Sequence, residues 1–124
     1  MSFVFSPTLD QAFLSSLYDD DLLYAQEIFR GFLAETKIEF EKIKTDYLQD
    51  ELKGMRQKLH KIKPTFSFVG LTTLSEKTES VIKACDESSH VSETEPGCSA
   101  LFIAIEDSFL IVEKELLRMK DHMT

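Results

Sequence analysis

The sequence contains little of what builds tight turns, covalent cross-links or membrane spans. Its 124 residues include four glycines, three prolines, two cysteines and no tryptophan. Because an all-β protein needs many tight turns, so few turn-forming residues argue against that class. No run of about 18 apolar residues occurs, so no transmembrane helix is predicted. The first residues lack the basic and apolar regions of a secretory signal peptide, and we therefore expect a cytoplasmic protein.

Positive charge is also scarce. Lys and Arg number 14 against 22 Asp and Glu, which gives a formal net charge of −8. Binding to DNA or RNA would therefore begin with electrostatic repulsion. Cys85 and Cys98 lie 13 positions apart without CxxC spacing. A disulfide between them is geometrically possible, but two reduced thiols are expected in a cytoplasmic protein.

Apolar side chains, ten phenylalanines among them, recur three and four positions apart along most of the chain. This spacing predicts helices at about residues 8–17, 20–46, 50–69 and 71–86, and a last helix from Leu101 to the end. The stretch at about 86–97 is rich in Ser, Glu, Pro and Gly, and we expect it to be a mobile loop.

The third of these helices carries the most regular apolar seam, which consists of Leu52, Met55, Leu59, Ile62, Phe66 and Val69. Alternating steps of three and four are typical of helices that pack inside an antiparallel bundle. The sequence therefore predicts one all-α domain over residues 1–124. Its expected architecture is an up-down-up-down antiparallel four-helix bundle with a short extra N-terminal helix.

A second row of side chains follows this seam one position later and consists of Lys53, Arg56, His60, Lys63, Ser67 and Gly70. One residue is a rotation of about 100° around a helix, so this row is predicted on or near the solvent side. A neutral imidazole is a good nucleophile near pH 7. Lys63 shares the face of His60 and can neutralise phosphoryl oxygens. His60 is thus a candidate phosphoryl acceptor.

Pro64 stands inside the same predicted helix. It removes the hydrogen bond that an N–H at this position would make to the His60 carbonyl, at a cost of about 3 kcal/mol. Since the seam continues to Val69, we expect a kink in the turn that carries His60 rather than an end to the helix. Without a long side chain, Pro64 would let a partner approach closely.

The run from Leu59 to Leu71 resembles the signature of histidine-containing phosphotransfer (HPt) domains. That signature has a phosphorylated histidine, a lysine three positions later, a small residue four later and a glycine ten later. His60, Lys63 and Gly70 match it, and Pro64 takes the small position that is usually glycine. The resemblance implies that His60 accepts a phosphoryl group at Nε2 from a receiver-domain aspartate or a kinase. It would then pass this group to another receiver domain in a two-component phosphorelay.

The resemblance also implies partners and supporting residues. Receiver domains or a hybrid sensor histidine kinase are the expected partners of a monomeric phosphocarrier without kinase activity of its own. The receiver would supply Mg²⁺ and most of the catalysis, so the chain would need no cofactor or metal. Pro64, Ser67, Gly70, Lys61 and Arg56 would support the site or dock the partner, although Gly70 is equally explained as a helix breaker.

Two further expectations concern the partner and the ring of His60. A basic stripe, defined as Lys53, Arg56, Lys58, Lys61 and Lys63, could steer an acidic receiver pocket towards the histidine. Many HPt domains have a glutamine on the next helix that bonds the imidazole. The corresponding residues here, 79–83, include no glutamine.

Two other hypotheses for the function compete with phosphotransfer. A helical adaptor without chemistry would keep the bundle and lose the phosphorylation. A di-metal bundle needs two Glu-x-x-His pairs, and the sequence has one such pair, Glu87 with His90, in the predicted loop. We expect His90 and His122 to be exposed bystanders. The chain would be either a stand-alone shuttle or a part of a larger hybrid kinase.

Overall fold

The computed structural model describes residues 2–124, which form five α-helices and one short 3₁₀-helix and contain no strand. In chain order the elements are α1 (Gln11–Tyr18), α2 (Leu22–Leu48), α3 (Leu52–Phe68), α4 (Thr72–Asp86), η1 (Val91–Thr94) and α5 (Gly97–Met123). The all-α prediction is therefore confirmed. Within the described residues, none of the helices combines the length and apolar character that crossing a membrane requires.

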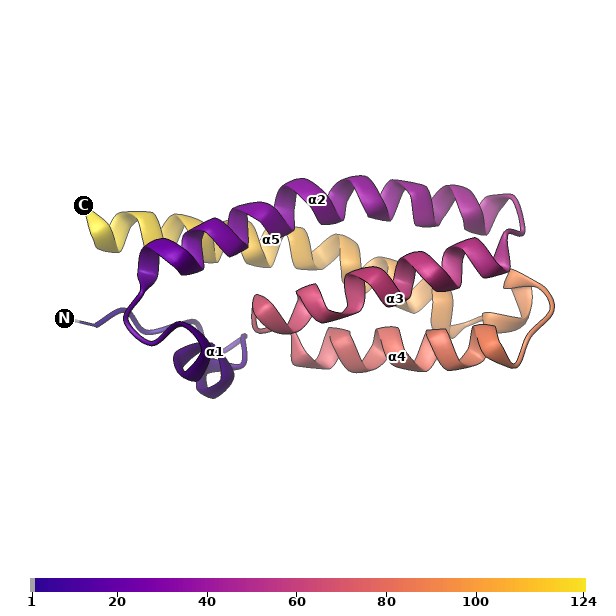
Figure 1. Ribbon diagram of the computed structural model, residues 1–124, viewed down its shortest axis with the longest axis horizontal. Helices are drawn as coiled ribbons and strands as arrows, with labels where there is room; N and C mark the ends of the chain where they lie inside the picture. The colour runs from indigo at the N-terminus through magenta and orange to yellow at the C-terminus, as the bar shows by residue number, and fades with distance from the viewer. Residues whose placement is uncertain (1) are drawn as a thin grey trace.

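The four long helices lie side by side, and α1 lies beside one end of the group (Figure 1). Helix α3 packs against α2 and α4, and α5 packs against the same two helices. The contacts thus close a ring around a shared interior. Each long helix turns one face inward and leaves the opposite face to solvent, as expected for a helical bundle.

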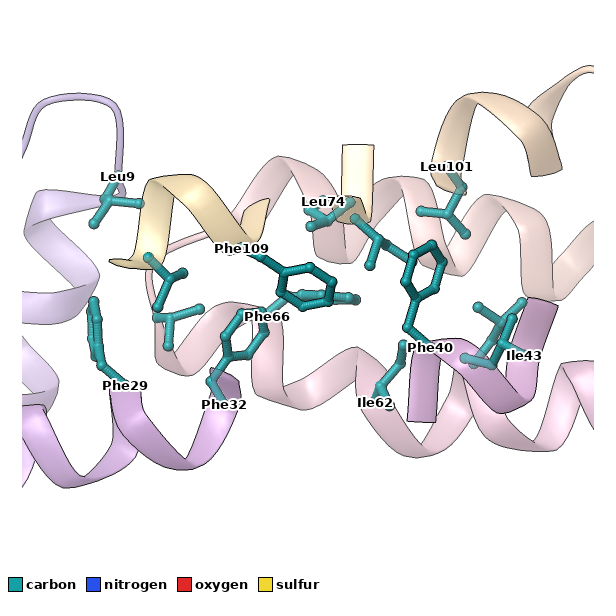
Figure 2. Close-up of a cluster of buried hydrophobic side chains, with 14 of the residues drawn as sticks. Leu9, Phe29, Phe32, Phe40, Ile43, Ile62, Phe66, Leu74, Leu101 and Phe109 are labelled. Carbon is teal, nitrogen blue, oxygen red and sulfur yellow. The ribbon is translucent and has the colours of Figure 1, made fainter. Parts of the chain in front are cut away.

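Aromatic and branched side chains from the long helices fill this interior (Figure 2). Phe32 and Phe66 meet edge to face with ring centroids 5.8 Å apart. The predicted seam of α3 is confirmed, because Leu52 is partly buried against the core and the other five members are buried. Burial of this seam fixes the rotation of α3 about its axis, and so determines which of its polar residues reach solvent.

Aspartates begin the first two helices. Asp10 precedes α1 and accepts a hydrogen bond from the Phe13 N–H at 3.1 Å. Asp21 precedes α2 and accepts one from the Tyr24 N–H, also at 3.1 Å. Such caps satisfy donors that have no partner inside the helix. The predicted start of the long helix at its cluster of aspartates is confirmed, with the boundary at Leu22.

The segment after α4 differs from the predicted loop at 86–97. It contains η1, and α5 already begins at Gly97 rather than at Leu101. The Asp50 carboxylate, from the turn before α3, accepts a hydrogen bond from the Val91 N–H at 2.8 Å and lies 2.7 Å from Nδ1 of His90. Helical periodicity does not predict this long-range contact. His90 is exposed as expected, but it is a bonded residue and not a bystander.

Both cysteines are buried free thiols, in agreement with the expectation. The Cys98 thiol lies 3.9 Å from the sulfur of Met55. Burial raises the pKa of Cys98 to about 12 and also raises the pKa of Cys85. Because the thiolate is the reactive form, neither group is a nucleophile near neutral pH.

Candidate functional site

His60 is the central residue of α3, with eight residues of the helix on either side. Its side chain is exposed, while Leu59 beside it and Ile62 two positions later belong to the core. Within residues 2–124 the imidazole makes no hydrogen bond or ion pair. Its ring nitrogens are therefore accessible to a reactant that approaches from solvent.

Lys63 lies on the same face of α3, nearly one turn after His60. Its Nζ is 2.7 Å from Oε2 of Glu79 on α4, and about a third of each side chain is exposed, 34% and 36%. The hydrogen bond from Lys63 holds the pKa of the Glu79 carboxyl below its ordinary value, and positive charge on His60 acts in the same direction. An ionised carboxylate thus lies within electrostatic range of both predicted site residues.

Carboxylates also pair with three further cations of the basic stripe. Arg56 pairs with Asp86 at 3.0 Å, Lys58 with Asp46 at 2.6 Å, and Lys61 with Glu39 at 3.5 Å. Of the stripe, Lys53 alone makes no ion pair within residues 2–124. Since paired charges cancel most of each other's field at a distance, the stripe is a weaker attractor for an acidic partner than its sequence indicates.

Pro64 and Ser67 follow His60 on the same face, one and two turns further along α3. Pro64 is exposed, and the helix continues past it to Phe68, so it does not end the helix. Lacking an N–H, it leaves the His60 carbonyl without its usual helical donor. Ser67 is partly buried. Because these two side chains are compact, they project little from the helix surface beyond the imidazole.

Gly70 does not belong to the immediate surroundings of His60. It is ten residues away, or about 15 Å along a helix, and it is buried in the turn after α3. Its φ is +78°, and an added Cβ would lie 2.6 Å from Cδ1 of Leu14. Its carbonyl accepts a hydrogen bond from the Asp10 N–H at 2.8 Å. The tight turn and the close approach of the N-terminal segment therefore explain why glycine stands here.

An apolar groove of about 610 Å³ runs between α2 and α3 on the side of Lys61. Its apolar lining includes Ile28, Ile38, Ile62 and Phe68, and three glutamates of α2, at positions 27, 35 and 39, also line it. Ile38 is 60% exposed and Phe68 43% exposed, so both present apolar surface to solvent. Phe66, two positions earlier, is fully buried instead. The groove itself was not predicted, although Ile38 stands off the apolar stripe of its helix.

The structure offers no support for the di-metal alternative. Among residues 2–124 there is no group of three or more His, Cys, Asp or Glu side chains that could hold a metal ion. Glu87 and His90, the single Glu-x-x-His pair, lie just after α4, where His90 contacts Asp50 instead. An inward-facing carboxylate and histidine set, as a di-metal bundle requires, is not assembled there.

No protein-family model, curated protein or solved structure matches the chain. Function is therefore inferred from the geometry around His60 together with the sequence motif. That geometry joins an accessible nucleophile, a cation on the same helical face, compact residues beyond them and an apolar groove alongside. Such a set is chemically suited to accepting a small anionic group at His60.

Proposed function

We propose that the chain is a histidine-containing phosphotransfer protein of a multistep phosphorelay. His60 accepts a phosphoryl group from a receiver-domain aspartate or a kinase and passes it to another receiver domain. The observation that carries this proposal is an exposed histidine at the centre of a bundle helix, with Lys63 on the same face. A cytoplasmic location, where receiver domains act, is part of the proposal.

The proposal includes the antiparallel up-down-up-down topology. Connections of three residues join α2 to α3 and α3 to α4. Short connections of this kind link antiparallel neighbours. The closed ring of contacts between α2, α3, α4 and α5 supports the same arrangement. In it, the middle of α3 is reached from the side of the bundle, away from the turns at its ends.

In the proposed transfer, Nε2 of His60 attacks the phosphorus of the aspartyl phosphate. The new N–P bond forms as the P–O bond breaks, and the electron pair of that bond returns to the aspartate carboxylate. The ring keeps its proton on Nδ1. Lys63 neutralises charge on the phosphoryl oxygens, and a receiver that holds Mg²⁺ would supply a further positive charge for the same oxygens. Transfer to the next receiver reverses these events.

The groove between α2 and α3 supports docking of a protein partner. Its exposed apolar residues, Ile38 and Phe68, are the kind that an interface covers. Lys61 lines the groove and directly follows His60 in α3. A partner seated there would therefore lie beside the imidazole. With most of the basic stripe ion-paired, contact between apolar surfaces is the larger contribution to this docking.

The alternative function, a helical adaptor without chemistry, rests on this same groove. A transfer screen separates the two. Receiver domains of the source organism, each carrying labelled phosphoryl, are mixed briefly with the protein and with its His60→Gln variant. Phosphorelay function predicts rapid labelling of the unaltered protein by at least one receiver and none of the variant. Binding of receivers without any labelling would instead identify an adaptor.

A further inference from the structure

The ion pair between α3 and α4 bears on what happens after His60 is phosphorylated. We propose that Glu79 competes with the phosphoryl group for Lys63, and so biases the protein towards passing the group on rather than storing it. This inference rests on the proposed function of His60. It concerns the lifetime and the equilibrium of phosphohistidine, and not the identity of the acceptor.

The competition follows from where the charges lie. In the unphosphorylated protein the Lys63 ammonium already has a carboxylate partner, Glu79, at 2.7 Å. The same carboxylate is within electrostatic range of His60. Both side chains are about one third exposed, so the ion pair is weak enough for Lys63 to change partners. It is also close enough to affect the energy of the phosphorylated state.

Phosphorylation changes this balance. The transferred group brings about two negative charges to the face that Lys63 shares with His60. To pair with it, the ammonium has to leave Glu79 or divide its hydrogen bonds between the two anions. If it leaves, an ionised carboxylate remains unpaired beside the new phosphoryl charge, and like charges at short range repel. In either case the phosphorylated state gains less from Lys63 than it would without Glu79.

Neighbouring charges on α4 do not remove this effect. Lys83, one turn after Glu79, also favours the ionised carboxylate, so Glu79 stays charged. Glu76, nearly one turn before Glu79, is exposed and makes no ion pair within residues 2–124. It therefore provides a matched control, because replacing it removes the same charge from the same helix without releasing Lys63.

The test compares Glu79→Gln with Glu76→Gln. Each protein is phosphorylated with potassium phosphoramidate, a small donor whose P–N bond breaks with release of ammonia as the histidine N–P bond forms. The lifetime of phosphohistidine is then followed by ³¹P NMR. In a second measurement, each protein is equilibrated with one labelled phospho-receiver, and the ratio of phosphohistidine to phospho-receiver is determined.

Glu79→Gln is expected to raise that ratio and to lengthen the lifetime by about two- to fivefold, the range of a partly exposed charge pair. Glu76→Gln should leave both close to those of the unaltered protein. In a Lys63→Ala background the gain from Glu79→Gln should shrink, because no ammonium remains to be released. If Glu79 had only a structural role, the effect of Glu79→Gln would not depend on the presence of Lys63.

Two results would overturn the inference. Equal effects of Glu79→Gln and Glu76→Gln would mean that release of Lys63 contributes nothing. A fall in the phosphohistidine ratio would mean that Glu79 helps by holding Lys63 in position. Failure of the proposed function looks different, since receivers would then either leave the unaltered protein unlabelled or label its His60→Gln variant equally fast.

Discussion

The Lys63 ammonium lies 2.7 Å from Oε2 of Glu79, so the cation nearest in sequence to His60 on its face is held from the neighbouring helix α4. This contact joins the two helices on the side where the imidazole is exposed. It also means that the lysine is neither a freely moving surface charge nor a buried one. Its position is set by packing between α3 and α4, which the spacing of residues in α3 alone does not reveal.

Lys63 is expected to speed phosphoryl transfer. Lys63→Ala should slow the first transfer into His60 by about tenfold, because one charge-assisted hydrogen bond to the phosphoryl oxygens is lost. Single-turnover transfer from a labelled phospho-receiver measures this rate. Lys53→Ala is the matched control, since Lys53 belongs to the same stripe and makes no ion pair within the described residues. Equal slowing by both substitutions would show a general charge effect instead.

Gly70 is expected to matter for stability rather than for chemistry. Gly70→Ala should lower the free energy of unfolding by about 2–4 kcal/mol, because φ is +78° and the new methyl group would meet Leu14. Urea unfolding followed by circular dichroism measures the change. Gly31 in α2 has no atom within 4 Å of an added Cβ, so Gly31→Ala should stabilise by about 0.5–1 kcal/mol. A stability of Gly70→Ala equal to that of the unaltered protein would contradict this account.

The contact between Asp50 and His90 predicts a pH dependence of stability. The hydrogen bond and charge of Asp50 raise the pKa of His90 above its ordinary 6.5, with a smaller contribution from Glu93. The His90 contribution is therefore complete below pH 6.5 and is lost as pH rises through the raised pKa. The pKa of Asp50 is lowered from 3.8, chiefly by the hydrogen bond with His90. Its contribution is present above pH 3.8 and is lost as pH falls through the lowered pKa.

The free energy of unfolding, measured at about pH 5.5 and about pH 9, tests whether this contact stabilises the protein. The difference between the unaltered protein and His90→Asn should be larger at the lower pH. Asp50→Asn should remove the same pH-dependent part, and the double variant should remove no more of it. A difference between the unaltered protein and His90→Asn that is the same at both pH values would mean that the charge on His90 contributes nothing to stability through this contact.

The groove between α2 and α3 predicts where a partner docks. Ile38→Asp should raise the receiver concentration needed for half-maximal transfer by about tenfold, a usual effect of a charge placed in an apolar contact. The maximal rate should change little, because Ile38 does not touch the reacting atoms. Leu48→Asp is the matched control, since Leu48 is 82% exposed and lies at the far end of the same helix. Equal effects of the two variants would exclude the groove as the docking surface.

Much of the fold was predictable from the sequence because burial imposes a period on each helix. The seam of α3 from Leu52 to Val69 gave the face of that helix, and with it the exposure of His60. The aspartates before α2 gave its start, since a short polar side chain satisfies the first N–H groups. Both features are local, so one segment of sequence contains all the information they need.

The features that were missed depend on contacts between distant segments. The pairing of Lys63 with Glu79 requires the relative rotation of two helices. The order of residues 91–94 depends on Asp50, about forty positions earlier in the chain. The close contact of Gly70 with Leu14 depends on how the N-terminal segment folds back. None of these is encoded in a period of three or four, which explains why the Glu79 carboxylate beside Lys63 and His60 was not identified from sequence.

The most direct test of the account is to locate the phosphoryl group after transfer. The unaltered protein, His60→Gln and His90→Gln are each mixed at short times with a labelled phospho-receiver from the source organism. The account predicts an alkali-stable, acid-labile phosphohistidine at Nε2 of His60, equal labelling of His90→Gln, and no labelling of His60→Gln. Labelling of His60→Gln at the rate of the unaltered protein would contradict it.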